Sequence, residues 1–248
     1  MRWDKKPPIG TPINFSHPLG KGLIVSYLVN EGGGRWAFDL ALKNQAVLTV
    51  GTWHLKGMNF PGSGLPGLDS TVTRFPTIGT GPYTMIYGVN PTSVSSVQSV
   101  GAFDTYAPAW IVDSGGALDI YHNGYKGAST SVLSVGKDYQ IGFVRRSTGA
   151  NDTYYYINGI QDATTITHGD NLGVPSIYRI GNDNFGNCLN GIILYNYMWN
   201  RALLRSEMEW IYAQPFDMFT PSKRYWVGIS VAPPTGKMPK VLFQSRMM

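Results

Sequence analysis

Short apolar segments separated by turn residues run through most of this sequence and constrain its fold more than any other feature. Runs such as GLIVSYLVN from Gly22, YTMIYGVN from Tyr83 and YQIGFVRR from Tyr139 each have the length of one strand. Two of the intervening turns, Ser114-Gly115-Gly116 and Asn158-Gly159, tolerate the positive φ angles that tight hairpins require. We therefore expect an all-β protein, built as an antiparallel β-sandwich.

The composition supports this fold class. Charged residues make up only 14% of the 248 residues, against about 25% in ordinary globular domains, while 30 Gly and 16 Pro provide many turns. Cys188 is the only cysteine, so no disulfide can form within the chain. The sequence contains no apolar run long enough to cross a membrane and no apolar signal-peptide core after Met1. We therefore expect neither a membrane span nor a secretion signal.

The net charge of +5 is concentrated at the two ends of the chain. Residues 1–21 and 217–248 are basic and interrupted by proline, whereas residues 22–216 carry slightly more acidic than basic side chains. We therefore expect an N-terminal extended arm (1–21), one β domain (22–216) and a C-terminal arm (217–248). Neither arm has a long basic run or a groove-reading motif, so we expect protein partners rather than nucleic acid.

One helix is predicted after the last strand. Ser206 and Glu209 have the spacing of a capping box, with Ser206 as the N-cap, and Pro215 ends the segment. The expected apolar face consists of Leu204, Met208 and either Ile211 or Tyr212. A helix of about two turns is not stable alone in water, so we expect this face to pack against the sandwich.

The region around this helix resembles a known family. The resemblance rests on the following residues: Asn190-Gly191, Tyr195-Asn196, Asn200-Arg201-Ala202-Leu203, Glu207 and Tyr212. Their order is similar to the closing segment of laminin G-like domains, which are concanavalin A-like jelly rolls. The resemblance implies that fold for the β domain, with one short C-terminal helix.

The start of the chain extends the resemblance. HPLGKGLIVSYLVNEGGG, from His17 to Gly34, is similar to the first strand of versions common in bacteriophage and bacterial proteins. The sequence departs from the family pattern at Tyr27 and Tyr139, where tryptophan is usual, and at Leu204, where a serine cap is usual. The resemblance implies a structural role in a bacteriophage virion, either as capsid decoration or as a subunit attached to the head or tail.

Catalytic signatures are weak in this sequence. Glycosidases that share this sandwich need two carboxylates flanking the scissile bond. The three glutamates are Glu31, Glu207 and Glu209, and the last two diverge by about 200° around a helix. The histidines lie far apart in the chain without the spacing of a zinc site: His17, His54, His122 and His168. We therefore expect a protein that is not an enzyme.

Two binding sites are predicted, each with an alternative explanation. Many laminin G-like domains bind calcium at a rim loop, and the resemblance places such a loop at Asn182, Asp183 and Asn184. Turn formation explains these residues equally well, and we expect no other cofactor. Aromatic residues that could stack on a sugar are Tyr106, Trp110, Tyr121 and Tyr125. Exposed tyrosines would serve a protein–protein interface equally well.

The C-terminal arm carries two strand-like apolar segments separated by prolines. Its predicted assembly residues are Arg224, Tyr225, Trp226, Val241, Leu242 and Phe243. Exposed segments of this kind promote edge-to-edge aggregation unless a partner covers them. The segments favour an assembly role, and together with the family resemblance they imply a virion subunit that forms a homo-oligomer or part of a capsid or tail lattice. The alternative is a carbohydrate-binding module for host-surface or environmental glycans, in an extracellular setting.

Overall fold

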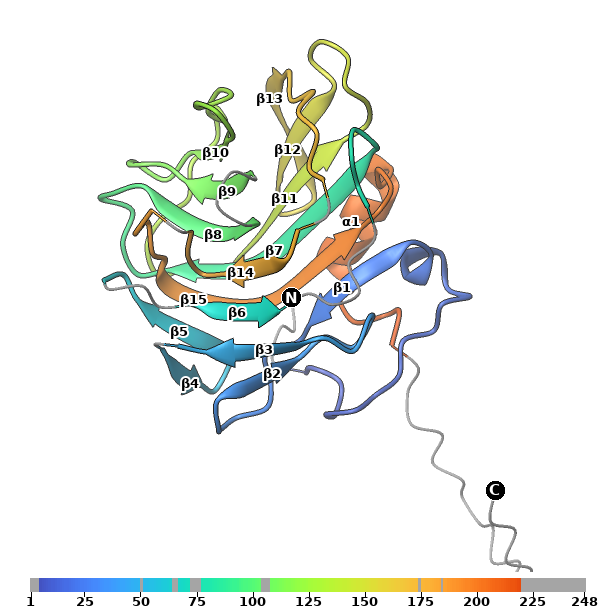
Figure 1. The fold of residues 1–248 in the computed structure, drawn as a ribbon, viewed down its shortest axis with the longest axis vertical. Helices are drawn as coiled ribbons and strands as arrows, with labels where there is room; N and C mark the ends of the chain where they lie inside the picture. Colours follow the sequence, from blue (N-terminus) through green and yellow to red (C-terminus); the bar gives the residue numbers. More distant parts are fainter. Residues whose placement is uncertain are drawn as a thin grey trace, which may run out of the picture.

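The computed structural model describes residues 5–49, 51–63, 67–71, 77–103, 108–173, 175–183 and 185–219. These residues form two antiparallel β-sheets packed face to face, with one α-helix near the C-terminal end of the described region (Figure 1). The expected antiparallel β-sandwich is confirmed. None of the described helices is long and apolar enough to cross a membrane.

The first sheet has eight strands. Their order is β13 (Ile160–Ile166), β12 (Thr153–Ile157), β11 (Tyr139–Arg145), β7 (Tyr83–Pro91), β15 (Asn190–Trp199), β5 (Gly57–Pro61) and β4 (Thr52–His54), with β1 (Leu23–Tyr27) also paired to β15. The long strand β15 is at the centre of this sheet because it pairs with β7, β5 and β1.

The second sheet has seven strands. Their order is β10 (Leu118–Tyr121), β9 (Ala109–Val112), β8 (Gln98–Phe103), β14 (Ile177–Ile180), β6 (Leu68–Thr71), β3 (Gln45–Leu48) and β2 (Trp36–Phe38). Strands β10 and β2 therefore form its two edges, and β9 lies between β10 and β8.

Local turn chemistry explains the two predicted hairpins. Asn158 and Gly159 both have positive φ, at 54° and 76°, and connect β12 to β13 with Ile157 paired to Ile160. The turn between β9 and β10 likewise contains Gly115 and Gly116 at positive φ, and these two strands are antiparallel. Both hairpin predictions are confirmed.

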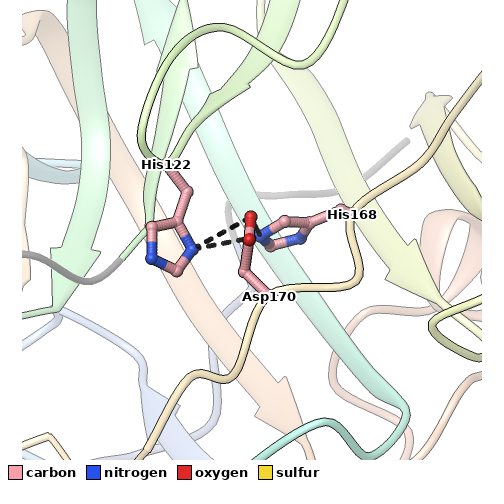
Figure 2. Close-up of side chains that lie close together, drawn as sticks. All are labelled: His122, His168 and Asp170. Carbon is pink, nitrogen blue, oxygen red and sulfur yellow. Dashed lines mark hydrogen bonds and ion pairs between the residues drawn. The ribbon is translucent and has the colours of Figure 1, made fainter.

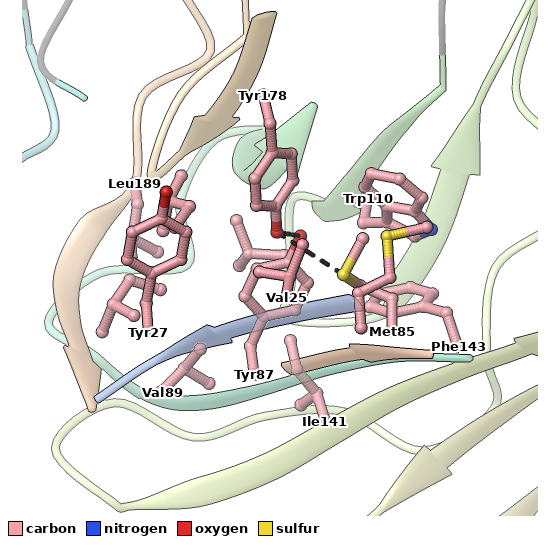
Figure 3. Packing of buried hydrophobic residues seen from close by; sticks show 14 of the residues in the cluster. Val25, Tyr27, Met85, Tyr87, Val89, Trp110, Ile141, Phe143, Tyr178 and Leu189 are labelled. Carbon is pink, nitrogen blue, oxygen red and sulfur yellow. Dashed lines mark hydrogen bonds between the residues drawn. The ribbon is translucent and has the colours of Figure 1, made fainter. Parts of the chain in front are cut away.

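The core lies between the two sheets and is rich in aromatic side chains (Figure 3). Tyrosine hydroxyl groups form hydrogen bonds inside this core. The hydroxyl oxygens of Tyr87 and Tyr178 are 3.0 Å apart, and the Tyr178 hydroxyl donates to Asn196 Oδ1 at 2.7 Å. Tyr27 and Tyr139, the two departures from the family pattern, are both buried. Pairing the hydroxyl groups inside the core offsets the cost of removing them from water.

The helix α1 (Arg205–Ala213) covers the outer face of the eight-stranded sheet. Its buried residues are Met208 and Ile211, whereas Leu204 is exposed, so the predicted apolar face is wrong at that position. The helix packs closely because Gly142 has no side chain: a Cβ there would lie 2.5 Å from Met208 Cε. The helix ends at Ala213, two residues before Pro215, as the sequence predicts.

The predicted N-cap is also wrong. The helix begins two residues before the expected position, with Leu204 at the N-cap instead of Ser206. Leucine cannot cap through its side chain, but Glu207 accepts a hydrogen bond from the Leu204 N–H at 2.9 Å. Arg201 holds this carboxylate with two hydrogen bonds of 2.8 Å. The hydrogen bond from the Leu204 N–H to the Glu207 carboxylate therefore stabilises the start of the helix without a serine at the N-cap.

The described part of the predicted N-terminal arm lies against the sandwich rather than extending from it. Lys6 donates to the Leu28 carbonyl at 2.6 Å, and Trp199 Nε1 donates to the carbonyl of Leu19, in the short 3-10 helix η1 (Pro18–Gly20), at 2.7 Å. Between these two contacts in the sequence, Ile13 forms an antiparallel bridge with Phe219. The six predicted assembly residues of the C-terminal arm lie outside the described residues.

Candidate functional site

An exposed group of aromatic rings lies where β10 ends. Tyr121 is the last residue of β10, and its ring centroid is 5.2 Å from that of Tyr125 and 6.3 Å from that of Phe185. The exposed fractions of these three residues are 37%, 56% and 64%, so the rings face solvent. They surround a small hollow of about 220 Å³, called here the aromatic pocket. Its lining residues are Val97, Ile111, Tyr121, Tyr125, Asp183, Phe185 and Asn187.

A tight turn places Tyr125 beside Tyr121. Asn123 and Gly124 both have positive φ, at 53° and 115°, and the turn brings Tyr121 and Tyr125 into an antiparallel bridge. Behind the turn, Asp119 is buried and its Oδ1 accepts from the Gly127 N–H at 3.0 Å. Burial raises the pKa of Asp119, and the backbone N–H groups around it oppose this rise. The loop is therefore anchored at its base.

The second wall of the aromatic pocket comes from the loop after β14. Asp183 Oδ1 accepts from the N–H groups of Phe185 at 2.8 Å and Asn187 at 3.1 Å, and its Oδ2 accepts from Asn187 Nδ2 at 2.8 Å. These bonds fold the loop back on itself and turn Phe185 outwards. Sequence reasoning missed Phe185 and Asn187 as site residues, although both follow closely after the predicted calcium residues Asn182, Asp183 and Asn184.

The predicted calcium loop is largely accounted for by turn formation. The one carboxylate in it, Asp183, is already bonded to three N–H groups. Asn182 is buried, and its Oδ1 has no hydrogen-bond partner among the described residues, which is the one feature that a cation would relieve. Asn184 lies outside the described residues. Calcium at this loop stays a prediction.

Trp110 does not belong to the aromatic surface, and its prediction as a sugar-stacking residue is wrong. Its side chain is fully buried in the core, where its ring centroid lies 5.1 Å from that of Phe103 and its Nε1 donates to the Tyr83 hydroxyl at 3.4 Å. Figure 3 shows it among the packed core residues. The reason is strand alternation: on β9, Trp110 occupies an inward position. Tyr106, the fourth predicted residue, lies outside the described residues.

A larger hollow lies elsewhere on the surface and lacks these features. It encloses about 490 Å³ beside the N-terminal segment. Its lining residues are Lys6, Pro7, Pro8, Ile9, Asn30, Leu55 and Lys56. None of these residues is aromatic, so this hollow offers no ring face for stacking, and the aromatic pocket is the stronger candidate.

A polar cluster that the sequence did not predict lies on the other side of β10. His122, His168 and Asp170 converge from two loops, and Figure 2 shows their side chains pointing toward one another. His168 is fully buried and His122 is nearly so. Burial, together with the positive charge of Arg145, lowers the pKa of His168 to about 3, so its imidazole is neutral at neutral pH. No local spacing could have revealed this cluster.

Comparison with known proteins identifies the fold class. No family model and no curated protein matches the chain. Among solved structures, a Trypanosoma rangeli sialidase in complex with 2,3-difluorosialic acid matches with a TM-score of 0.62 at 17% identity, over 80% of this chain and 34% of the sialidase. The binding domain of botulinum neurotoxin serotype D matches with a TM-score of 0.61 at 10% identity, over 77% of this chain and 51% of the neurotoxin chain.

These similarities show that the proteins share a β-sandwich fold, and they show neither a family nor a function for this chain. The chain spans about a third of the sialidase and about half of the neurotoxin chain. The comparisons do not test the narrower resemblance to laminin G-like domains of bacteriophage proteins, which stays a prediction.

The prediction that the chain is not an enzyme is contradicted by the same comparison. The solved structures that share the fold include sialidases, which are enzymes. The positions of the glutamates and histidines argued against only two catalytic arrangements, so they did not justify excluding catalysis in general.

Proposed function

We propose that this protein is a carbohydrate-binding module and that the aromatic pocket is its binding site. The proposal rests on three exposed rings around one hollow: Tyr121 at the end of β10, Tyr125 in the loop after it, and Phe185 in the loop after β14. Tyrosine presents an apolar ring and a polar hydroxyl, which suits a ligand that has both C–H faces and hydroxyl groups.

Polar groups at the base of the pocket can orient a sugar. An ionised carboxylate has about four acceptor positions, and three N–H groups of the loop bond to Asp183, so one position remains for a sugar hydroxyl. The Asn187 amide lies beside it. A hollow of about 220 Å³ is below the range of ~300–1,000 Å³ typical of small-molecule pockets. The size favours one sugar ring at a chain end over a buried oligosaccharide.

The charge around the pocket favours a neutral sugar. Burial raises the pKa of Tyr125, and the nearby Asp113, Tyr121, Asp119 and Asp183 raise it further, as expected beside a group of carboxylates. The lining residues include no lysine or arginine. An anionic sugar would be repelled here, so we expect neutral hexoses to bind better than sialic acid.

The similar structures support the proposal at the level of ligand class. One is a Trypanosoma rangeli sialidase in complex with sialic acid, and another concerns a botulinum neurotoxin type C whose cell entry depends on two ganglioside molecules. Both proteins therefore engage sugars or glycolipids.

Glycan-array binding of the full chain and two alanine variants tests the site. We expect Tyr125→Ala and Phe185→Ala each to weaken binding to a neutral glycan about tenfold, because each removes a stacking face. Trp36→Ala is the matched control, since Trp36 is an exposed aromatic at the opposite edge of the same sheet. Loss of binding in the Trp36 variant alone would place the site elsewhere. No saccharide binding at millimolar ligand would reject the proposed function.

A bacteriophage virion setting remains a proposal of its own. Its support is the sequence resemblance over residues 17–216 and the apolar segments of the C-terminal arm. Such a subunit would present the aromatic pocket on the particle surface while the arm contacts other virion proteins. Localisation to the virion and the identity of those partners are part of this proposal.

A further inference from the structure

We propose that His122, His168 and Asp170 form a binding site for a four-coordinate divalent metal ion of the zinc class. The three atoms that would bind it form a nearly regular triangle. Asp170 Oδ2 lies 3.4 Å from His122 Nδ1 and 3.7 Å from His168 Nε2, and the two imidazole nitrogens are 3.5 Å apart. Each residue contributes one atom, and Figure 2 shows the three side chains lying close together.

The size of this triangle matches tetrahedral coordination. Zinc binds imidazole nitrogen and carboxylate oxygen at about 2.1 Å, so neighbouring ligand atoms in a tetrahedron are about 3.4 Å apart. An octahedral site with similar bond lengths would need separations of about 3.0 Å. The observed separations are also longer than the ~2.9 Å of a well-formed N–H···O hydrogen bond. The geometry therefore fits a tetrahedral ion better than either alternative.

The donor set points to the same class of ion. Two imidazoles and one carboxylate suit zinc and its neighbours in the first transition series, whereas calcium and magnesium prefer oxygen ligands throughout. The side chain of Asp170 is 31% exposed, but its Oδ2 is buried and lies 2.9 Å from Lys126 Nζ. The ligand atoms therefore lie just beneath the surface, and an ion with a water as its fourth ligand reaches them once the Lys126 side chain moves aside.

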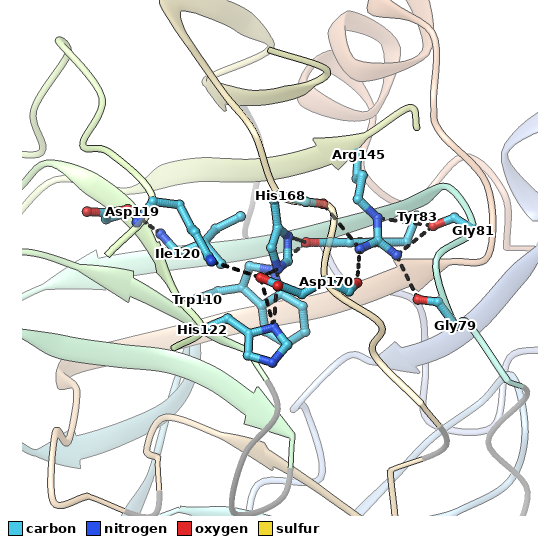
Figure 4. Close-up of polar contacts among 11 residues, drawn as sticks. Gly79, Gly81, Tyr83, Trp110, Asp119, Ile120, His122, Arg145, His168 and Asp170 are labelled. Atoms are coloured by element: carbon cyan, nitrogen blue, oxygen red, sulfur yellow. Dashed lines mark hydrogen bonds and ion pairs between the residues drawn. The ribbon is translucent and has the colours of Figure 1, made fainter. Parts of the chain in front are cut away.

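Neighbouring residues hold His168 and Asp170 in place (Figure 4). The Tyr83 hydroxyl lies 3.2 Å from His168 Nδ1, which orients the ring and leaves Nε2 for the ion. Arg145, which is fully buried, donates to the carbonyl of His168 at 3.4 Å and to that of Asp170 at 2.7 Å. A single guanidinium therefore fixes the backbone of two of the three ligands.

One cation competes for the site. Lys126 Nζ lies 2.9 Å from Asp170 Oδ2, and its side chain is 20% exposed. A metal ion bound to the same oxygen would repel this ammonium group, which must then turn toward solvent. Lys126 therefore lowers the affinity for metal without being a ligand.

Calorimetric titration of the chelator-treated full chain with zinc tests the proposal. We expect one ion per chain with a micromolar or tighter Kd, and cobalt bound at the same site should give the intense visible absorption of four-coordinate Co²⁺. Absence of saturable binding up to about 0.1 mM zinc, or a weak six-coordinate cobalt spectrum, would overturn it.

Variants identify the ligands. His122→Gln and Asp170→Asn should each weaken zinc binding more than tenfold, whereas Lys126→Met should strengthen it several-fold. His54→Gln and Lys137→Met are controls, because both residues are exposed and lie outside the cluster. Circular dichroism confirms that each variant is folded. Loss of binding in the His54 variant, or unchanged binding in the Asp170 variant, would show that the ion binds elsewhere.

Discussion

At the scale of single residues, Asp162 on β13 is the clearest case of a buried charge held by hydrogen bonds. Its Oδ1 accepts from Thr130 Oγ1 at 2.9 Å and the Thr164 N–H at 2.8 Å, and its Oδ2 accepts from the Ser131 N–H at 2.8 Å. Burial alone would raise the pKa of Asp162, but these hydrogen bonds outweigh it and hold the pKa well below the usual range.

The low pKa has a consequence for acid stability. A depressed folded-state pKa adds stability that is present above the unfolded-state value of about 4 and is lost as the pH falls through the folded-state value. Asp162→Asn should therefore lower the free energy of unfolding by about 1–3 kcal/mol at pH 7, and by less at pH 3.

Urea unfolding at both pH values measures the difference between wild type and variant. Asp113→Asn is the control, since Asp113 is only half-buried and its Oδ1 accepts a hydrogen bond from the N–H of the adjacent Ser114. An Asp162 variant that loses the same free energy at pH 3 as at pH 7 would contradict the expectation.

The residue scale also shows where sequence reasoning about the site fails. Tyr106, Trp110, Tyr121 and Tyr125 lie close together in the sequence, but which rings face outwards depends on the phase of each strand. Trp110 is inward on β9, while Tyr121 lies at the exposed end of β10. Phase is set by pairing with other strands, and a single apolar strand such as AWIV gives no alternation from which to read it.

At the scale of elements, the start of α1 depends on a side chain inside the helix rather than on its N-cap. Glu207 bonds to both the Leu204 N–H and the Arg201 guanidinium. The presence of this helix and its end before Pro215 could be predicted from apolar spacing and the proline. Its first residue could not, because Ser206 offered an equally good local signal and the decisive partner, Arg201, precedes the helix.

Two glutamates on this helix allow a matched comparison. Glu207→Ala should lower the free energy of unfolding by about 2 kcal/mol. The substitution removes the partly buried ion pair with Arg201 and the hydrogen bond from the Leu204 N–H. Glu209→Ala should cost below about 0.5 kcal/mol, because its pair with Arg205 is exposed. Chemical denaturation of both variants measures the two values, and equal losses would show that the Glu207 contacts do not stabilise the helix start.

At the scale of the whole molecule, the first and last described segments of the chain meet on the sandwich. Ile13 pairs with Phe219, and Met218 and Phe219 are buried in the cluster beneath α1. The sandwich and its hairpins could be predicted because turn residues act locally. The meeting of His122 with His168, 46 residues apart, could not, because it depends on how two loops fold over the sheet.

Truncation separates the sandwich from the C-terminal arm. A chain ending at Phe219 should remain folded, because it keeps the bridge to Ile13. If the arm is an assembly element, light scattering at matched concentration should show an oligomer for the full chain and a monomer for the truncated chain. Identical masses would reject the arm as an assembly element and would leave glycan binding unaffected.

Tyr121 and His122 are neighbours in sequence, yet one borders the aromatic pocket and the other belongs to the histidine cluster. The same short loop, from Asn123 to Gly127, follows both. An ion that orders this loop would reduce the conformational entropy that a sugar must remove when it binds. By thermodynamic linkage, the factor by which metal improves sugar affinity equals the factor by which sugar improves metal affinity. The edge of this sheet would then couple two chemically unrelated ligands through a single turn of backbone.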